Sequence, residues 1–169
     1  IHCGLVGSEM CIRDSNVNAS QIRDRKTELF SSFIIQNKQK LRESVYEMIR
    51  YTKDNNIKLA FSTSTTVNNV EAVFESLSNQ ISKADFDFIG NRSFVNNEKP
   101  HPEIYKVTLE KLNLKPEECL AIEDTEESSN AAVNASVKCI AFPGDFHKED
   151  KFDMCIKKMN LLDQTIFSL

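Results

Sequence analysis

The sequence predicts an α/β fold, a Rossmann-like parallel sheet with helices on both faces. Short apolar runs of strand length occur at residues 57–62, 86–89, 119–122 and 138–142, and helical patterns lie between them. Strand and helix patterns that alternate along a chain are typical of parallel sheets, because parallel strands need a crossover connection. The runs are largely apolar, as expected for strands that are covered on both faces.

Two helical patterns come before the first apolar run. In residues 20–36 the apolar side chains fall on or near one face, and the Ser20 hydroxyl is suited to cap the first turn. These apolar residues are Ile22, Leu29, Phe30, Phe33 and Ile34. A polar stretch at 36–40 breaks the pattern and is suited to a linker. A second helix is expected from about residue 41 to residues 54–56, with apolar positions at Leu41, Val45 and Ile49.

The later runs are followed by further helices. One apolar stripe after the first run comprises Val67, Val70, Val73, Phe74 and Leu77. Pro102 suits the first turn of the next helix, where its missing N–H costs nothing. The residues expected to face the core in that helix are Ile104, Tyr105, Leu109 and Leu112. A short helix packed close to the sheet is predicted from Ala131, Ala132 and Ala135, and residues 154–156 are a weaker fifth strand.

Composition excludes several classes of protein. A chain of 169 residues suits one domain with a real core, and a net charge of −4 argues against nucleic-acid binding. No apolar run approaches the roughly 18 residues of a membrane span, and no signal peptide is visible. We expect a cytoplasmic monomer, or one in the plastid stroma if the source is eukaryotic. The cysteines form no C-x-x-C pair and are expected to be buried free thiols: Cys3, Cys11, Cys119, Cys139 and Cys155.

Hydroxyl side chains follow the first apolar run directly, at Thr63, Ser64 and Thr65. Hydroxyls and backbone N–H groups before a helix start can form a phosphate cradle. The alternative is that these residues only cap the helix. Because ligands of parallel sheets bind at the carboxyl ends of the strands, Thr63 can share a site with residues at other strand ends.

A lysine and an acidic pair complete the pattern. Lys99 precedes Pro100, which favours an extended backbone, and its ammonium group is suited to neutralise phosphoryl charge. Glu123 and Asp124 end the apolar run at 119–122, and carboxylates at a buried strand end need a charged partner or a metal ion such as Mg²⁺. The alternatives are a surface lysine and a solvated acidic loop.

In this order the motifs resemble those of the haloacid dehalogenase superfamily, in its β-phosphoglucomutase-like, CbbY-type group. Residues 58–63 are similar to the second motif of that superfamily. Lys99-Pro100, with Pro102 and Tyr105, is similar to the third, and residues 122–125, with Ala131-Ala132, are similar to the fourth. The hydroxyl run is most similar to that of CbbY-type sugar-bisphosphate phosphatases.

The resemblance implies a role for each site residue. Thr63 would hydrogen-bond the phosphoryl group and Lys99 would balance its charge, as the two catalytic residues. Ser64 and Thr65 would also contact phosphate. Asp124, assisted by Glu123, would hold Mg²⁺. Lys26 would grip the distal phosphate of the substrate from a helical cap.

The implied function is a Mg²⁺-dependent phosphatase that hydrolyses a small sugar phosphate or sugar bisphosphate through an aspartyl-phosphate. Residues 16–38 would be a remnant of the cap, and residues 39–169 an incomplete α/β core. The alternatives are a β-phosphoglucomutase-like phosphomutase and a non-catalytic phosphate-binding protein.

The sequence departs from the family pattern in several places. The first motif, Asp-x-Asp-Gly, is absent, and residues 1–15 resemble a translated sequencing adaptor. We therefore expect a truncated core that lacks its first strand and its nucleophile, and an inactive chain. Ser128 stands in place of a glycine and Glu43-Ser44 in place of Pro-Gly. Because glycine adopts positive φ most easily, local backbone differences are expected there.

Overall fold

The computed structural model describes residues 18–168, so the adaptor-like stretch at 1–15, with Cys3 and Cys11, lies outside the described residues, as does the Ser20 side chain. The helices are α2 (Ala19–Gln36), α3 (Val45–Asp54), α4 (Val67–Ser76), α5 (Glu103–Leu112) and α6 (Glu126–Asn134). The strands are β1 (Ala60–Ser62), β2 (Phe88–Gly90), β3 (Leu120–Glu123), β4 (Lys138–Ala141) and β5 (Lys157–Lys158). Short 3₁₀ helices are η1 (Lys83–Asp85), η2 (Arg92–Phe94), η3 (Pro116–Glu118), η4 (Asp145–His147) and η5 (Gln164–Ser168).

The strands form two parallel sheets. β1 pairs with β2, with Phe61 opposite Ile89, and β3, β4 and β5 form the second sheet in that order. Every strand pair is parallel, which confirms the predicted α/β class. The predicted sheet is nevertheless divided, because no described backbone hydrogen bond joins β1 to β3.

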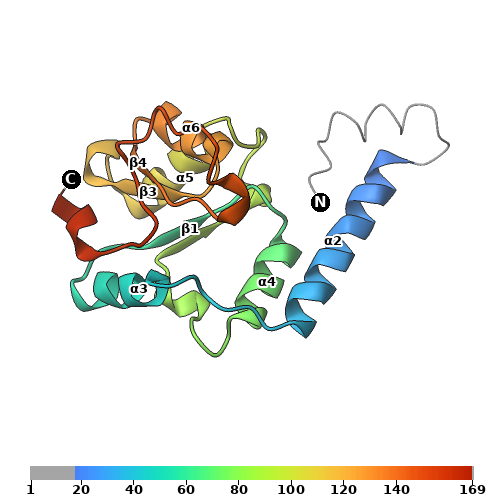
Figure 1. The fold of residues 1–169 in the computed structure, drawn as a ribbon. Helices are drawn as coiled ribbons and strands as arrows, with labels where there is room; N and C mark the ends of the chain where they lie inside the picture. The colour runs from blue at the N-terminus through green and yellow to red at the C-terminus, as the bar shows by residue number, and fades with distance from the viewer. Residues whose placement is uncertain (1–17, 169) are drawn as a thin grey trace.

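Helices cover both sides of the strands, as predicted. α3 and α4 lie on one side of β1, and α5 and α6 lie on the other side, near β3 and β4 (Figure 1). On the first side, Val70 and Phe74 of α4, with Leu77 directly after the helix, pack against Phe61 and Ile89 of the strands. The Phe61, Phe74 and Phe86 rings meet edge to face with centroids 5.4 to 6.1 Å apart, a favourable aromatic arrangement.

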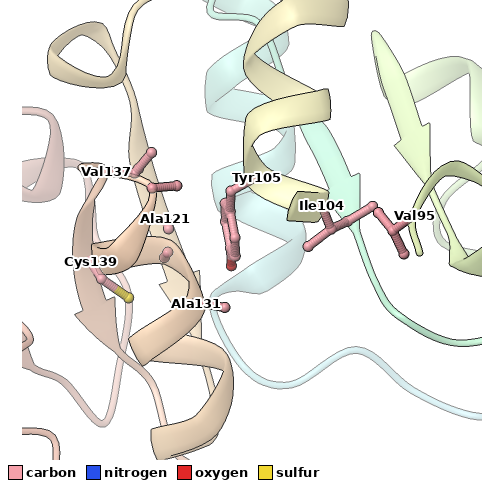
Figure 2. Packing of buried hydrophobic residues seen from close by; sticks show 9 residues of the cluster. Val95, Ile104, Tyr105, Ala121, Ala131, Val137 and Cys139 are labelled. Atoms are coloured by element: carbon pink, nitrogen blue, oxygen red, sulfur yellow. The ribbon is translucent and has the colours of Figure 1, made fainter. Parts of the chain in front are cut away.

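On the other side of the strands, α6 packs against β3 and β4 through small residues. Ala131 and Ala132 of α6 are fully buried, so this helix approaches β3 and β4 closely, as the alanine pattern predicted. Figure 2 shows Tyr105 between α5 and the β3–α6 unit that carries Ala121 and Ala131. Burial, followed by the neighbouring Cys155, raises the pKa of the Cys139 thiol to about 12. Cys139 therefore stays protonated and packs as a small apolar side chain; Cys119 and Cys155 are also free thiols, and both are half-buried.

Two boundaries differ from the prediction. The predicted helix start near residue 41 was wrong, because Ser44 adopts a left-handed conformation with φ 70° and α3 begins at Val45. Ser44 is one of the positions where the family pattern has glycine, whereas Ser128 lies in the regular helix α6. The fifth strand is at 157–158 rather than at 154–156, because it is Lys157 and Lys158 that pair with Ile140 and Ala141 of β4.

Helix α2 stands beside α4 and apart from the other helices (Figure 1). Ile34 is buried, but most of the apolar face stays exposed: Ile22, Leu29, Phe30 and Phe33. The helical pattern was therefore predicted correctly, while the packing of its apolar face on the rest of the chain is slight. Within residues 18–168, no helix combines the length and the apolar character needed to cross a bilayer.

Candidate active site

The carboxyl ends of β1 and β3 meet at Lys99. The Lys99 backbone N–H donates to Ser64 Oγ at 3.2 Å, two residues beyond β1. The Lys99 ammonium group donates to Glu123 Oε1, the last residue of β3, at 2.7 Å. One lysine therefore connects the hydroxyl loop to the acidic strand end, although the two strands belong to different sheets.

Glu123 is held by a second donor, Tyr105, whose hydroxyl group hydrogen-bonds to the same oxygen Oε1. The Lys99 and Glu123 side chains are only 11% and 12% exposed, and the Lys99 Nζ atom lies 5.2 Å from the centroid of the Tyr105 ring. Burial, the Glu123 charge and the hydrogen bond hold the pKa of Tyr105 well above its usual value. Tyr105 therefore remains a neutral donor across the physiological pH range.

From the sequence, Tyr105 was expected in the core, with no role in the site. Its spacing after Lys99, in Lys-Pro-x-Pro-x-x-Tyr, was the available signal. Because Tyr105 is in the first turn of α5, it reaches the same carboxylate as the lysine that precedes the helix. The Lys99–Pro100 peptide bond is cis.

The loop before Lys99 is fixed by Glu103, the first residue of α5. Its carboxylate accepts hydrogen bonds from the backbone N–H groups of Asn96 and Asn97, at 3.0 and 2.9 Å. The Asn96 backbone N–H, the Asn97 side chain and the Asn97 backbone N–H together lower the pKa of Glu103 to about 2. Glu103 thus anchors the segment that carries Lys99.

Glu103 is expected to contribute acid sensitivity to folding. Its pKa is about 2 in the folded state, against 4.5 without these contacts, so its contribution is present above about pH 5 and is lost as the pH falls toward 2. Glu103→Gln is therefore expected to flatten the decline in unfolding free energy over this range. Urea titrations from pH 6 to pH 2.5 measure it, with Glu110→Gln, an exposed position of the same helix, as the control. Equal slopes in both variants would contradict the assignment.

The hydroxyl loop between β1 and α4 is ordered by local bonds. Thr63 Oγ1 accepts from the Thr65 backbone N–H at 3.2 Å, and the Thr66 hydroxyl caps α4 by accepting from Asn69 N–H. The same loop joins the neighbouring strand, because the Thr63 N–H donates to Gly90 O at 3.2 Å. Backbone donors and hydroxyls at a helix start favour the binding of an anion such as phosphate.

A hydrogen-bonded chain connects this loop to α2. Asn69 Nδ2 donates to Thr65 Oγ1 at 2.7 Å, and Ser31 Oγ of α2 donates to Asn69 Oδ1 at 3.0 Å. Ser31 and Asn69 have no predicted role in the sequence, because only the tertiary packing of α2 on α4 brings them together. The orientation of the Thr65 hydroxyl thus depends on where α2 lies.

The remaining predicted site residues are less closely associated. Lys26 is exposed on α2, where it lines a groove with Arg25 and Phe30 rather than the strand ends. Asp124 follows Glu123 and is exposed, and the next residue, Thr125, caps α6 by accepting from Ser128 N–H. The structure therefore brings together Ser64, Lys99 and Glu123, and leaves Lys26 on a separate element.

The acidic pair can supply part of a magnesium site. No group of three or more His, Cys, Asp or Glu side chains within residues 18–168 is arranged to hold a metal ion. Mg²⁺ needs only one or two carboxylates when water and phosphate oxygens complete its shell. The exposed Asp124 carboxylate fits that requirement, while Glu123 is already bonded to Lys99 and Tyr105.

Curated proteins are similar to this chain in sequence. Protein CbbY from Cereibacter sphaeroides is 32% identical over 133 residues, which cover 79% of this chain and 58% of that protein. A phosphorylated carbohydrates phosphatase from Thermotoga maritima is 32% identical over 130 residues, covering 76% and 56% of the two chains. The chain thus spans less than two thirds of the length of these relatives.

Solved structures agree with the fold. A mutant of CbbY from Rhodobacter sphaeroides, in complex with xylulose-(1,5)bisphosphate, matches with a TM-score of 0.80 and 28% identity, over 87% of this chain and 65% of that chain. A β-phosphoglucomutase from Clostridium difficile shares the fold, with a TM-score of 0.74 at 22% identity, over 91% and 67% of the two chains. The family model for haloacid dehalogenase-like hydrolases matches residues 5–142. The chain belongs to the haloacid dehalogenase-like hydrolase family.

Proposed function

We propose that this chain forms part of a Mg²⁺-dependent phosphatase that acts on a small sugar phosphate or sugar bisphosphate. The observation that carries the proposal is the position of Lys99, whose backbone contacts the hydroxyl loop after β1 and whose ammonium group contacts Glu123 at the end of β3. A cation between a phosphate cradle and an acidic strand end suits the transfer of a phosphoryl group. The similarity to CbbY and to a phosphorylated carbohydrates phosphatase supports this substrate class.

Each residue has a part in the proposed reaction. Thr63 and Ser64 donate hydrogen bonds to phosphoryl oxygens, together with backbone N–H groups at the start of α4, and Thr65 is oriented by Asn69 for the same purpose. Lys99 balances the negative charge of the transferring group. Lys26 contacts the distal phosphate of a bisphosphate when α2 closes over the site.

Asp124, assisted by Glu123, would hold Mg²⁺, and the bound ion would supply positive charge to the phosphoryl oxygens. The phosphoryl group passes to an aspartate carboxylate and then to water. No Asp-x-Asp ends an apolar strand upstream of Thr63 in this sequence, so we assign the nucleophile to residues outside this chain. The chain alone is therefore expected to release no phosphate.

The test is to recover the gene with its upstream sequence and to assay the encoded protein. We expect Mg²⁺-dependent phosphate release from a panel of sugar phosphates that includes xylulose-1,5-bisphosphate, and none from the 169-residue chain. Removing Mg²⁺ with a chelator is expected to abolish turnover. Conversion to an isomeric sugar phosphate would identify a phosphomutase instead. A folded protein that binds phosphate analogues without turnover over the whole panel would overturn the proposal in favour of a binding protein.

A further inference from the structure

Two free cysteines lie on neighbouring segments of the second sheet. Cys139 is the second residue of β4, and Cys155 comes shortly before β5, the strand that pairs with β4. The Ile156 backbone N–H donates to Cys139 O at 2.9 Å, so the residue directly after Cys155 is bonded to Cys139. This bond holds the two cysteine backbones close together, although residues 140–154 separate them in the sequence.

The side chains of both cysteines lie on the same face of this sheet. Cys139 is buried in the cluster that contains Ala131 of α6, and Cys155 packs against that same cluster. The next residue of β4, Ile140, belongs instead to the cluster that contains Met48 of α3. Because successive side chains of a strand point to opposite faces, Cys139 and Cys155 share the face that α6 covers.

The two thiols also interact with each other. Burial has the largest effect on the pKa of Cys139, and Cys155 raises this pKa further, through its charge and through a hydrogen bond between the two side chains. Cys119 packs against the same cluster, but its pKa is raised by burial and then by Glu118 rather than by another thiol. Among the cysteines of residues 18–168, the interacting pair is therefore Cys139 and Cys155.

The two thiols differ in their access to solvent. Cys139 is 0% exposed, whereas Cys155 is half-buried in a bend between the exposed residues Met154 and Ile156. A small oxidant in solution therefore reaches Cys155 first. When a cysteine is oxidised to a sulfenic acid, a neighbouring thiol condenses with it to form a disulfide. Cys139 is the thiol in position to do so.

We propose that Cys139 and Cys155 are a site of reversible oxidation, at which a peroxide converts the two thiols into a disulfide between β4 and the segment that precedes β5. In the first step the Cys155 sulfur attacks hydrogen peroxide. An S–O bond forms, the O–O bond breaks, and the released hydroxide leaves as water with the Cys155 thiol proton.

In the second step the Cys139 sulfur attacks the sulfur of the Cys155 sulfenic acid. The S–S bond forms, the S–O bond breaks, and the hydroxide leaves as a second water with the Cys139 proton. The two thiols together lose two electrons, which reduce one peroxide to two waters. Because the fold already holds the two residues together, this step is intramolecular and is favoured over reaction with a thiol of another molecule.

The disulfide would close the chain over residues 140–154. A cross-link of this kind restricts the unfolded chain, so the oxidised protein is expected to unfold at a higher urea concentration than the reduced protein. The proposal does not depend on the proposed phosphatase activity, because the product is a covalent bond that is detected without any turnover.

The experiment treats the complete 169-residue chain with hydrogen peroxide, blocks the remaining thiols with N-ethylmaleimide and maps the disulfides by mass spectrometry. Trypsin cleaves after the lysines that flank both cysteines, so the expected product joins peptides 139–148 and 152–157. We expect this product in most of the monomeric protein, and its disappearance after treatment with dithiothreitol. It is expected to form faster in the folded chain than in urea, because folding brings the two thiols together.

A matched pair of variants tests the pairing. Cys155→Ser is expected to abolish the linked peptides, whereas Cys119→Ser, which also changes a half-buried cysteine, is expected to leave them unchanged. In Cys139→Ala the sulfenic acid of Cys155 has lost its partner, so dimedone is expected to label peptide 152–157. Circular dichroism checks that each variant is folded.

Several results would overturn the proposal. One is a disulfide that joins Cys155 to Cys3, Cys11 or Cys119 in place of Cys139. Another is oxidation of Cys155 to a sulfinic acid while Cys139 stays a free thiol. A third is a Cys139–Cys155 disulfide that forms no faster in the folded chain than in urea, and a fourth is the absence of any oxidation at Cys155.

Discussion

Replacing Lys99 with methionine is expected to lower the free energy of unfolding by about 3 kcal/mol, because it leaves the Glu123 carboxylate without its cation in a largely buried site. The Lys99 and Glu123 side chains are 11% and 12% exposed, and their charged groups are 2.7 Å apart. Tyr105 remains as a hydrogen-bond donor to Glu123, but it is a neutral one. A urea titration measures this loss. The buffer contains trimethylamine N-oxide, which stabilises the folded state, so that the signal of the folded protein can be recorded before unfolding begins.

A double-mutant cycle separates the ion pair from the packing of the lysine stem. Adding Glu123→Gln to Lys99→Met removes the unpaired charge, so the double variant is expected to regain a large part of the loss. Lys106→Met, at an exposed position of α5, is the control and is expected to change stability by less than about 0.5 kcal/mol. If Lys99→Met proves as neutral as that control, Lys99 and Glu123 do not form a stabilising pair in solution.

Ile104→Ala is expected to have a comparable effect, lowering the free energy of unfolding by about 2 to 5 kcal/mol. Ile104 is 1% exposed and lies against β2, where a Cβ atom added to Gly90 would come within 2.9 Å of Ile104 Cδ1. Truncation would leave a cavity between α5 and β2 that the short strand cannot fill. The same urea titration measures the change.

Two further variants show whether the loss of unfolding free energy depends on the size of the truncation and on burial. Ile104→Val removes a single methyl group and is expected to cost about 1 kcal/mol. Ile156→Ala shortens an isoleucine that is 47% exposed and is expected to change stability much less. Equal losses for Ile104→Ala and Ile156→Ala would contradict the packing of α5 on β2.

Much of the fold could be predicted from local patterns. The apolar runs predicted four of the strands to within a few residues, and the helical stripes predicted α2, α4, α5 and α6. These patterns are visible because a buried strand and an amphipathic helix each require apolar side chains at a characteristic spacing. The start of α3 was wrong, because the left-handed Ser44 interrupts a regular apolar pattern that has no glycine to mark the break.

Some features of the candidate site could be predicted from the sequence, and others could not. The hydroxyl loop and the acidic pair could be predicted to lie close together, because parallel strands end on the same side. The bond of Tyr105 to Glu123 and the bridge from Ser31 through Asn69 to Thr65 could not be predicted, because they depend on how α5 and α2 pack. The roles assigned to all the site residues stay predictions: Lys26, Thr63, Ser64, Thr65, Lys99, Glu123 and Asp124.

The sequence by itself determined the α/β class and the order of the motifs, since both depend on residue type and spacing along the chain. Only the tertiary structure decided that the strands divide into two sheets with an apolar groove between them, and that Lys99 joins their carboxyl ends. The physical reason is that strand pairing and side-chain contact are made between residues distant in sequence. The spacing of residues along the chain specifies which elements form, whereas their packing decides which backbone edges and charges meet.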